Sequence, residues 1–134
     1  MNPQKSDTVR RWFDEVWNKN NESAIAELMH TEANAIGLGA DAIIGPSGFK
    51  PFYDAFNSAY SNIHVTVDKT LVDGDYVTAM CTVEATHKQT GNRVKFAGVS
   101  VTTIENGQIT KAWNYFDFLT LNLQIGKITP EQLI

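Results

Sequence analysis

One carboxylate in the last third of the chain has a setting that suits acid or base chemistry. Asp117 lies near the end of the segment 108–118, which is predicted to be a strand. In an extended strand, Asp117 points to the same side as Trp113 and Tyr115. A carboxylate at the end of an aromatic-lined face is partly desolvated, which raises its pKa and makes it a usable base or acid near neutral pH. Asp117 is therefore the first catalytic candidate, and Trp113 and Tyr115 are candidate substrate contacts.

Asp117 also fits a purely structural role. Residues 119–124 predict a short C-terminal helix, and Asp is favoured at the residue that caps a helix N-terminus. The two interpretations differ in ionisation, because a dry pocket raises the pKa of a carboxyl group and a capping position lowers it. The pattern alone favours neither interpretation.

The three histidines are weaker candidates. His87 ends the apolar face of a predicted strand (residues 76–88), so it is either a hydrogen-bond donor or proton shuttle at a pocket mouth or a surface residue. His30 ends a predicted helix, where a capping interaction with the helix dipole competes with a substrate contact. His64 falls on the polar face of its strand and is expected to be exposed.

Signatures of several other catalytic sites are missing from the sequence. It contains no G-x-x-x-x-G-K-[ST] phosphate loop, no G-x-G-x-x-G after a strand, no H-E-x-x-H and no G-x-S-x-G nucleophile turn. The histidines belong to three different predicted elements, so no metal site is expected. Cys81 is the single cysteine, which excludes an intrachain disulfide and favours a packing role in a buried strand.

Three amphipathic helices are predicted in the first half of the chain. Apolar residues spaced by three and four form a stripe that ends at Trp17, and a second helix is expected over residues 22–30. Ser47 is expected to cap a third helix, which carries Phe56 and has Pro51 in its first turn, where a missing N–H is tolerated. Trp17 and Phe56 are candidate contacts to a substrate held beneath these helices.

The second half of the chain shows the alternation typical of strands. Strands are predicted at residues 63–71, 76–88, 93–105 and 108–118, with tight turns at Asp73-Gly74-Asp75 and Asn106-Gly107. Helices followed by a meander indicate an α+β fold. Strands this long curl, and helices can close their concave side. The predicted architecture is therefore a cone-shaped, curved antiparallel sheet with three N-terminal helices enclosing a pocket for a small hydrophobic molecule.

Size and composition predict one globular domain over residues 1–134. The net charge of −4 and the scattered Lys and Arg residues argue against nucleic acid and against an anionic membrane surface. No stretch approaches the length of apolar residues that a membrane helix needs. Residues 1–7 are polar and lead into no apolar run, so no signal peptide is expected and a cytoplasmic location follows by default.

Several short motifs, in this order and spacing, resemble the SnoaL-like polyketide cyclases of the nuclear transport factor 2-like superfamily. They extend over nearly the whole chain: Glu15-Val16-Trp17-Asn18, Ile25-Ala26-Glu27-Leu28, Gly45-Pro46-Ser47-Gly48-Phe49, Gly74-Asp75 to Ala79, Thr86-His87, Gly91 to Gly98, Asn106-Gly107-Gln108-Ile109, Trp113, Asp117 and Gln124-Ile125-Gly126. Each motif is weak alone, and the series together is fairly specific.

The resemblance implies a cofactor-free, often homodimeric protein with a deep hydrophobic pocket. In such cyclases an aspartate at the position of Asp117 is the acid/base of an intramolecular aldol closure, a reaction that needs a modest base and a delocalised enolate. Two residues depart from the family pattern. Ile36 stands where many relatives have a polar residue, which would make the pocket wall more apolar, and Lys111 stands where an acidic residue is frequent.

Three functions are compatible with these observations. The first is a lyase or isomerase acting on a small apolar carbonyl compound, with Asp117 as acid/base and His87 and Trp113 assisting. The second is a non-catalytic module that binds a hydrophobic small molecule or supports dimerisation. The third, an epoxide hydrolase, is disfavoured because its Asp-Arg-Asp grouping would have to rely on Arg93, the single arginine of the sheet region.

Overall fold

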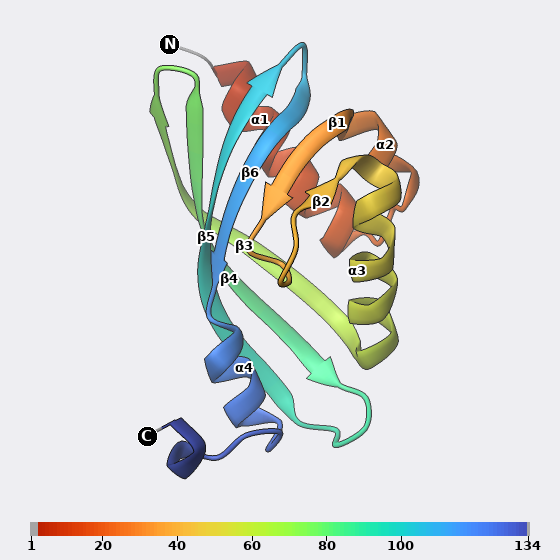
Figure 1. The fold of residues 1–134 in the computed structure, drawn as a ribbon, viewed down its shortest axis with the longest axis vertical. Helices are drawn as coiled ribbons and strands as arrows, with labels where there is room; N and C mark the ends of the chain where they lie inside the picture. Colours follow the sequence, from red (N-terminus) through yellow and green to blue (C-terminus); the bar gives the residue numbers. More distant parts are fainter. Residues whose placement is uncertain (1–2, 134) are drawn as a thin grey trace.

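The computed structural model describes residues 3–133 and shows a curved sheet with helices against one side (Figure 1). In chain order the elements are α1 (Pro3–Arg11), the π-helix η1 (Trp12–Asn18), α2 (Ser23–Leu28), β1 (Met29–Ile36), β2 (Ile43–Ile44), α3 (Gly45–Ala59), β3 (Tyr60–Asp73), β4 (Tyr76–His87), β5 (Arg93–Glu105), β6 (Gln108–Phe116), α4 (Phe118–Gln124) and the 3-10 helix η2 (Pro130–Leu133). The predicted α+β architecture, with a curved sheet and N-terminal helices, is confirmed.

The sheet has six strands in the order β2-β1-β6-β5-β4-β3. Strands β3 to β6 form the predicted antiparallel meander, and β1 adds to it by running parallel to β6. Asn106 and Gly107 have φ values of 52° and 74°, as the hairpin turn predicted for this pair requires. Figure 1 shows the long strands bending past α1 and α3, with α4 following the end of β6. Met1, Asn2 and Ile134 lie outside the described residues. The prediction of one domain over residues 1–134 and the expectation of no signal peptide in residues 1–7 therefore stay predictions at these positions.

The first predicted helix divides into two kinds of helix. The chain is α-helical to Arg11 and continues as the π-helix η1. A π-helix closes its hydrogen bonds one residue later than an α-helix, and such turns are frequent at functional sites. A pattern with the α-helical period cannot reveal this change.

The prediction that the second helix reaches His30 is wrong. Helix α2 ends at Leu28, and Met29 already has extended backbone angles (φ −118°, ψ 123°). Met29 pairs with Ile109 of β6, and Ala33 and Ala35 continue the buried side of β1. Pairing with a neighbouring strand overrides the helical spacing of the sequence here, so His30 lies in a strand.

The third helix begins earlier than predicted. It starts at Gly45 after Ile44 and has no side-chain cap, so the expected cap at Ser47 is wrong. Pro51 consequently lies in the helix interior, beyond the first turn, where it removes the N–H that would bond to Ser47. Gly45 has φ 66°, and a Cβ atom there would lie 2.2 Å from the carbonyl oxygen of Thr31, so this close approach to β1 requires glycine.

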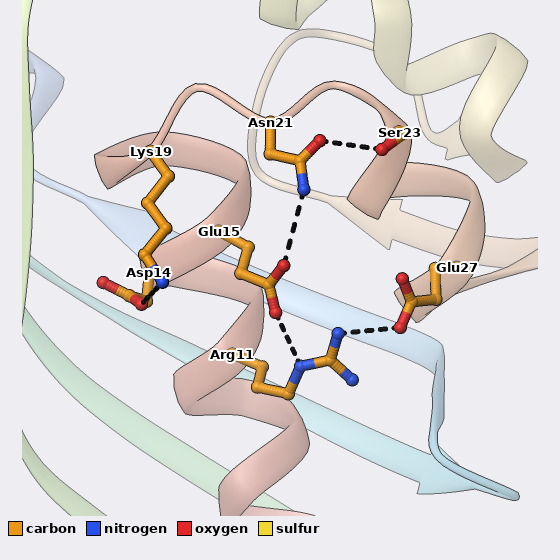
Figure 2. A network of polar contacts seen from close by, with 7 residues as sticks. All are labelled: Arg11, Asp14, Glu15, Lys19, Asn21, Ser23 and Glu27. Atoms are coloured by element: carbon orange, nitrogen blue, oxygen red, sulfur yellow. Dashed lines mark hydrogen bonds and ion pairs between the residues drawn. The ribbon is translucent and has the colours of Figure 1, made fainter.

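A polar network on the protein surface joins η1 to α2 (Figure 2). The Arg11 guanidinium donates from Nε to Glu15 Oε2 and from Nη2 to Glu27 Oε2, both at 2.7 Å. The Asn21 amide donates to Glu15 Oε1 at 3.4 Å and accepts from the Ser23 hydroxyl at 2.7 Å. The bond from Arg11 holds the pKa of Glu15 below its ordinary value. Exposed pairs of this kind stabilise weakly, so the network mainly orients η1.

The core is one cluster of buried side chains between the helices and the concave side of the sheet. Its most buried large members are Leu28, Val9, Val16, Val77 and Val94.

None of the helices within residues 3–133 combines the length and apolarity needed to cross a bilayer.

Candidate functional site

A cavity of about 90 Å³ lies between the helices and the concave face of the sheet. One water molecule needs roughly 10–15 Å³ in such a measure, and the cavity is partly open, so it accommodates a small organic molecule that extends through its mouth. Within the described part of the chain, no Asp, Glu, Lys, Arg or His side chain lines this cavity. The cavity is therefore suited to a neutral, mostly apolar ligand.

The helical wall of the cavity is aromatic. Trp12, Phe13 and Trp17 reach it from η1, and Phe49, Phe52 and Phe56 reach it from α3. The Trp17 ring centroid lies 5.6–6.2 Å from those of the three phenylalanines, in edge-on arrangements. Such contacts favour one arrangement of the rings, so the wall is largely preformed. The structure thus places Trp17 and Phe56 in the cavity wall, while their contact with a substrate stays a prediction.

The sheet wall depends on one glycine. Gly98 of β5 is paired with Phe116 of β6, and the phenyl ring of Phe116 lies across the position that a side chain at residue 98 would occupy. A Cβ atom on Gly98 would approach Cδ2 of Phe116 to 2.2 Å. Glycine at this position therefore allows Phe116 to lie against the sheet as part of the cavity lining.

Three polar side chains interrupt the apolar lining of the sheet wall. Ser100 and Thr102 lie on β5, and Asn114 lies opposite Ser100 on β6. The Ser100 hydroxyl donates to Asn114 Oδ1 at 2.9 Å, and Asn114 Nδ2 donates to the carbonyl oxygen of Ile36 at 3.0 Å. All three side chains are at most 9% exposed. The sequence prediction missed them, although Asn114 lies between the inward-facing Ala112 and Phe116 of its own strand.

Asp117 lies outside this cavity. Its side chain is exposed and caps α4, accepting hydrogen bonds from the Thr120 backbone N–H at 2.9 Å and from the Thr120 hydroxyl at 2.6 Å. These bonds lower the pKa of Asp117, so the raised pKa predicted for a dry pocket is wrong. The chain neighbours Phe116 and Phe118 do line the cavity, so Asp117 lies beside its edge.

Trp113 and Tyr115 share one side of β6 as predicted, but that side is the outer face of the sheet. Tyr115 is 63% exposed, and the Trp113 ring packs against Tyr76 with a centroid distance of 5.9 Å. Their predicted place in the pocket is therefore wrong. The reason is the register, because Ser100 pairs with Asn114 and thereby turns that residue and its alternates inward.

The histidines also lie outside the cavity lining. His87 is half-buried at the end of β4, with Nδ1 2.9 Å from the Thr90 hydroxyl and its ring 5.2 Å from that of Tyr60. His30 accepts a hydrogen bond from the backbone N–H of Glu32 at 3.0 Å. His64 is exposed, as predicted. The catalytic role of His87 and the substrate contact of His30 stay predictions.

Two further sequence expectations concern single residues. Ile36 does not make the pocket wall more apolar, since its side chain is exposed at the end of β1 and only its carbonyl oxygen meets the Asn114 amide. Cys81 is buried, and burial raises the pKa of its thiol to about 12, which keeps the thiol neutral and unreactive. Its predicted packing role is confirmed.

Comparison with known proteins places this geometry in a family. A model of the SnoaL-like polyketide cyclases matches residues 7–125. A candidate polyketide cyclase from Bacillus cereus ATCC 10987 is 26% identical, with a TM-score of 0.84 over 94% of this chain and 83% of its own. A candidate SnoaL-like polyketide cyclase from Jannaschia sp. CCS1 is 22% identical, with a TM-score of 0.83 over 93% of both chains.

A third structure identifies the class of fold. A protein from Catenulispora acidiphila DSM 44928, described as having a ketosteroid isomerase-like fold, is 20% identical and has a TM-score of 0.80 over 92% of this chain and 98% of its own. The fold is thus the nuclear transport factor 2-like cone. The chain belongs to the SnoaL-like polyketide cyclase family, and family and fold support a role of the cyclase or isomerase type in general. A search among curated proteins found no match.

Proposed function

We propose that this protein binds a small, mostly apolar molecule in the cavity between η1, α3 and the concave face of the sheet. The observation that carries the proposal is the cavity itself, with its aromatic helical wall and its uncharged lining within the described residues. A pocket lined by apolar side chains with a few polar groups is typical of small-molecule sites. The proposal therefore rests on geometry and on the chemistry of the wall.

The size of the binding energy follows from the buried area. A two-ring aromatic molecule buries roughly 150–250 Å², as a large aromatic side chain does. At about 25 cal/mol per Å², this burial favours binding by roughly 4–6 kcal/mol before polar contacts. The loss of translational and rotational freedom on association opposes this gain, so we expect weak binding of an unsubstituted two-ring hydrocarbon, with a dissociation constant of about 1 mM.

An NMR titration tests this proposal. Naphthalene is added to protein with ¹³C-labelled methyl groups, and shifts are expected at Val65, Val83 and Ile109, which line the cavity. Ala112→Phe should abolish binding, because Ala112 also lines the cavity and the larger side chain fills it. Ala97→Phe on the same sheet is the matched control, since Ala97 is exposed and lies outside the cavity lining. Equal loss of binding in both variants, or none in either, would exclude the cavity as the site.

A second candidate function adds catalysis by Asp117. The favouring observation is that Phe116 and Phe118, its two chain neighbours, line the cavity. The lowered pKa keeps Asp117 ionised near neutral pH, so it would act first as a base. It would take a proton from a carbon next to a carbonyl group at the cavity edge and later return that proton to the product. This is the general acid/base role expected of a cyclase or isomerase.

Deuterium exchange separates catalysis from binding. The exchange of the protons on the carbon next to the carbonyl of 1-tetralone is followed by NMR in heavy water, with and without protein. Asp117→Asn should remove the acceleration while keeping the helix cap, because Asn is also a good capping residue. Undiminished exchange in Asp117→Asn, or no acceleration by the unaltered protein, would reject Asp117 as the base.

The predicted homodimer stays part of the proposal. Met80, Val99 and Tyr115 lie side by side across β4, β5 and β6 on the outer face, and Met80 and Tyr115 are exposed. A second copy packed on this row would bury it. Light scattering after size-exclusion chromatography should give a dimer mass for the unaltered protein and a monomer mass for the Met80→Lys, Tyr115→Lys double variant. A monomer before substitution would reject this surface as an interface.

A further inference from the structure

The polar contacts of Asn114 determine the direction of every hydrogen bond around it. Its amide contacts the carbonyl oxygen of Ile36, and a carbonyl oxygen only accepts. Nδ2 must therefore face Ile36, and Oδ1 must face Ser100. Because Oδ1 also only accepts, the Ser100 hydroxyl has to use its single hydrogen on Asn114.

A count of the remaining donors and acceptors defines what a ligand would meet. The amide nitrogen of Asn114 carries two hydrogens, and one of them has no acceptor among the described residues. The Ser100 oxygen keeps lone pairs that can accept a further bond. The hydroxyl of Thr102, which donates to the Val77 carbonyl oxygen at 3.1 Å, likewise keeps only acceptor capacity for a ligand. Ser100, Thr102 and Asn114 all line the cavity, so this wall offers one N–H donor beside hydroxyl acceptors.

We propose that the cavity selects a neutral apolar molecule bearing a hydroxyl group, with Asn114 and Ser100 as the residues that determine this specificity. This inference rests on the proposed function and names its ligand class. A hydroxyl group accepts from Asn114 Nδ2–H and donates to Ser100 Oγ, so it pairs with both the free donor and a free acceptor of the wall. A ketone accepts from Asn114 alone, and a hydrocarbon leaves the polar atoms without a ligand partner.

A carboxylate is disfavoured at the same position. No Lys, Arg or His side chain of the described residues lines the cavity, so nothing there would neutralise an anion. Moving an ionised carboxylate from water into a site that has no counter-charge costs a large desolvation free energy. The wall therefore distinguishes an alcohol from the corresponding acid, even when the two have similar shape.

A matched ligand series tests the inference. Naphthalene, 1-tetralone, 2-naphthol and 2-naphthoate have similar ring systems and differ in their oxygen groups, and their dissociation constants are measured at pH 7 by NMR titration. The unaltered protein should bind 2-naphthol at least as tightly as naphthalene, 1-tetralone more weakly than 2-naphthol, and 2-naphthoate at least tenfold more weakly than 2-naphthol.

The variant Asn114→Leu removes the amide while keeping a side chain of similar size. It should weaken 2-naphthol binding by roughly three- to tenfold, the value of one hydrogen bond, and leave naphthalene binding unweakened. Thr103→Val is the control, because it removes a hydroxyl from the neighbouring strand β5. The partner of this hydroxyl is Thr110, and Thr103 lies outside the cavity lining. This control should change the binding of neither 2-naphthol nor naphthalene.

The outcomes separate this inference from the function on which it rests. If naphthalene or 1-tetralone binds more tightly than 2-naphthol, or if Asn114→Leu binds 2-naphthol as the unaltered protein does, the hydroxyl specificity is rejected while the apolar site stands. If no member of the series binds, the proposed function fails first. Should Asn114→Leu not fold, the ranking of the four ligands on the unaltered protein still decides the question.

Discussion

The two faces of β6 differ in where their side chains lie. The inner face places Asn114 and Phe116 in the cavity wall, whereas the outer face carries Trp113 and Tyr115. By residue type alone the outer face is the more aromatic of the two. The inner face nevertheless forms the site, because the register with β5 turns it toward the helices and the glycine at position 98 leaves room for the Phe116 ring. Aromatic content is therefore a poor guide to the inside of a curved sheet.

The largest expected effect comes from truncating one aromatic residue on each face. Phe116→Ala removes a ring that packs against the core and lines the cavity, so we expect a loss of about 2–4 kcal/mol in the free energy of unfolding. Tyr115→Ala removes an exposed ring and should cost less than about 0.5 kcal/mol in a monomeric sample. Urea denaturation of both variants measures the difference. Similar losses would mean that the faces are not as distinct as the structure shows.

A smaller effect is expected from adding one methyl group on the inner face. Gly98→Ala places a Cβ atom against both the ring and the backbone Cα atom of Phe116, so the ring and the strand must both shift, at a cost of about 1–3 kcal/mol. The double variant Gly98→Ala, Phe116→Ala should lose less stability than the sum of the two single losses, because the ring that the new methyl group would meet is already absent. Denaturation midpoints of the single and double variants check this. Additive losses would contradict the direct contact.

The end of β6 gives a further comparison, between the cap and the cavity. Asp117→Ala removes both hydrogen bonds to Thr120, so we expect the melting temperature to fall by a few degrees, whereas Asp117→Asn should lower it less. Naphthalene binding should survive in Asp117→Asn. A loss of binding in that variant would show that the carboxylate contributes to the cavity after all.

The smallest effect is the pH dependence of the same cap. The pKa of Asp117 is lowered in the folded protein by the bonds from Thr120, so its stabilising contribution is present above the unfolded pKa and is lost as the pH falls through the folded value. The stability of the unaltered protein should therefore decline more than that of Asp117→Asn below about pH 4. Melting curves from pH 2.5 to 7 measure the two slopes. Parallel curves would indicate that Asp117 has an ordinary pKa.

The sequence predicted the elements whose signals are local. Alternation and the Asn106-Gly107 turn were sufficient for the meander, since both act over a few residues. The start of strand β1 was wrongly predicted to be helical, because Met29 takes its conformation from pairing with Ile109, about eighty residues away. The π-helix η1 was predicted to be an α-helix because its apolar residues have α-helical spacing.

The candidate site was harder to predict than the fold. Trp17 and Phe56 were placed in the cavity because helical stripes point to the core. Asn114 was missed because a polar residue in a strand is assigned by default to the solvent side. Only the register with Ser100 shows that the amide faces inward and is paired there.

The account stands on a ligand binding against the concave face, and intermolecular nuclear Overhauser effects test that most directly. Protein with labelled methyl groups is saturated with 2-naphthol, and contacts from the ligand protons are recorded. We predict contacts with Val83 and Ile109, which line the cavity, and none with Val99 or Val101, which lie on the outer side of β5. Contacts with Val99 and Val101 in place of Val83 and Ile109 would contradict the account.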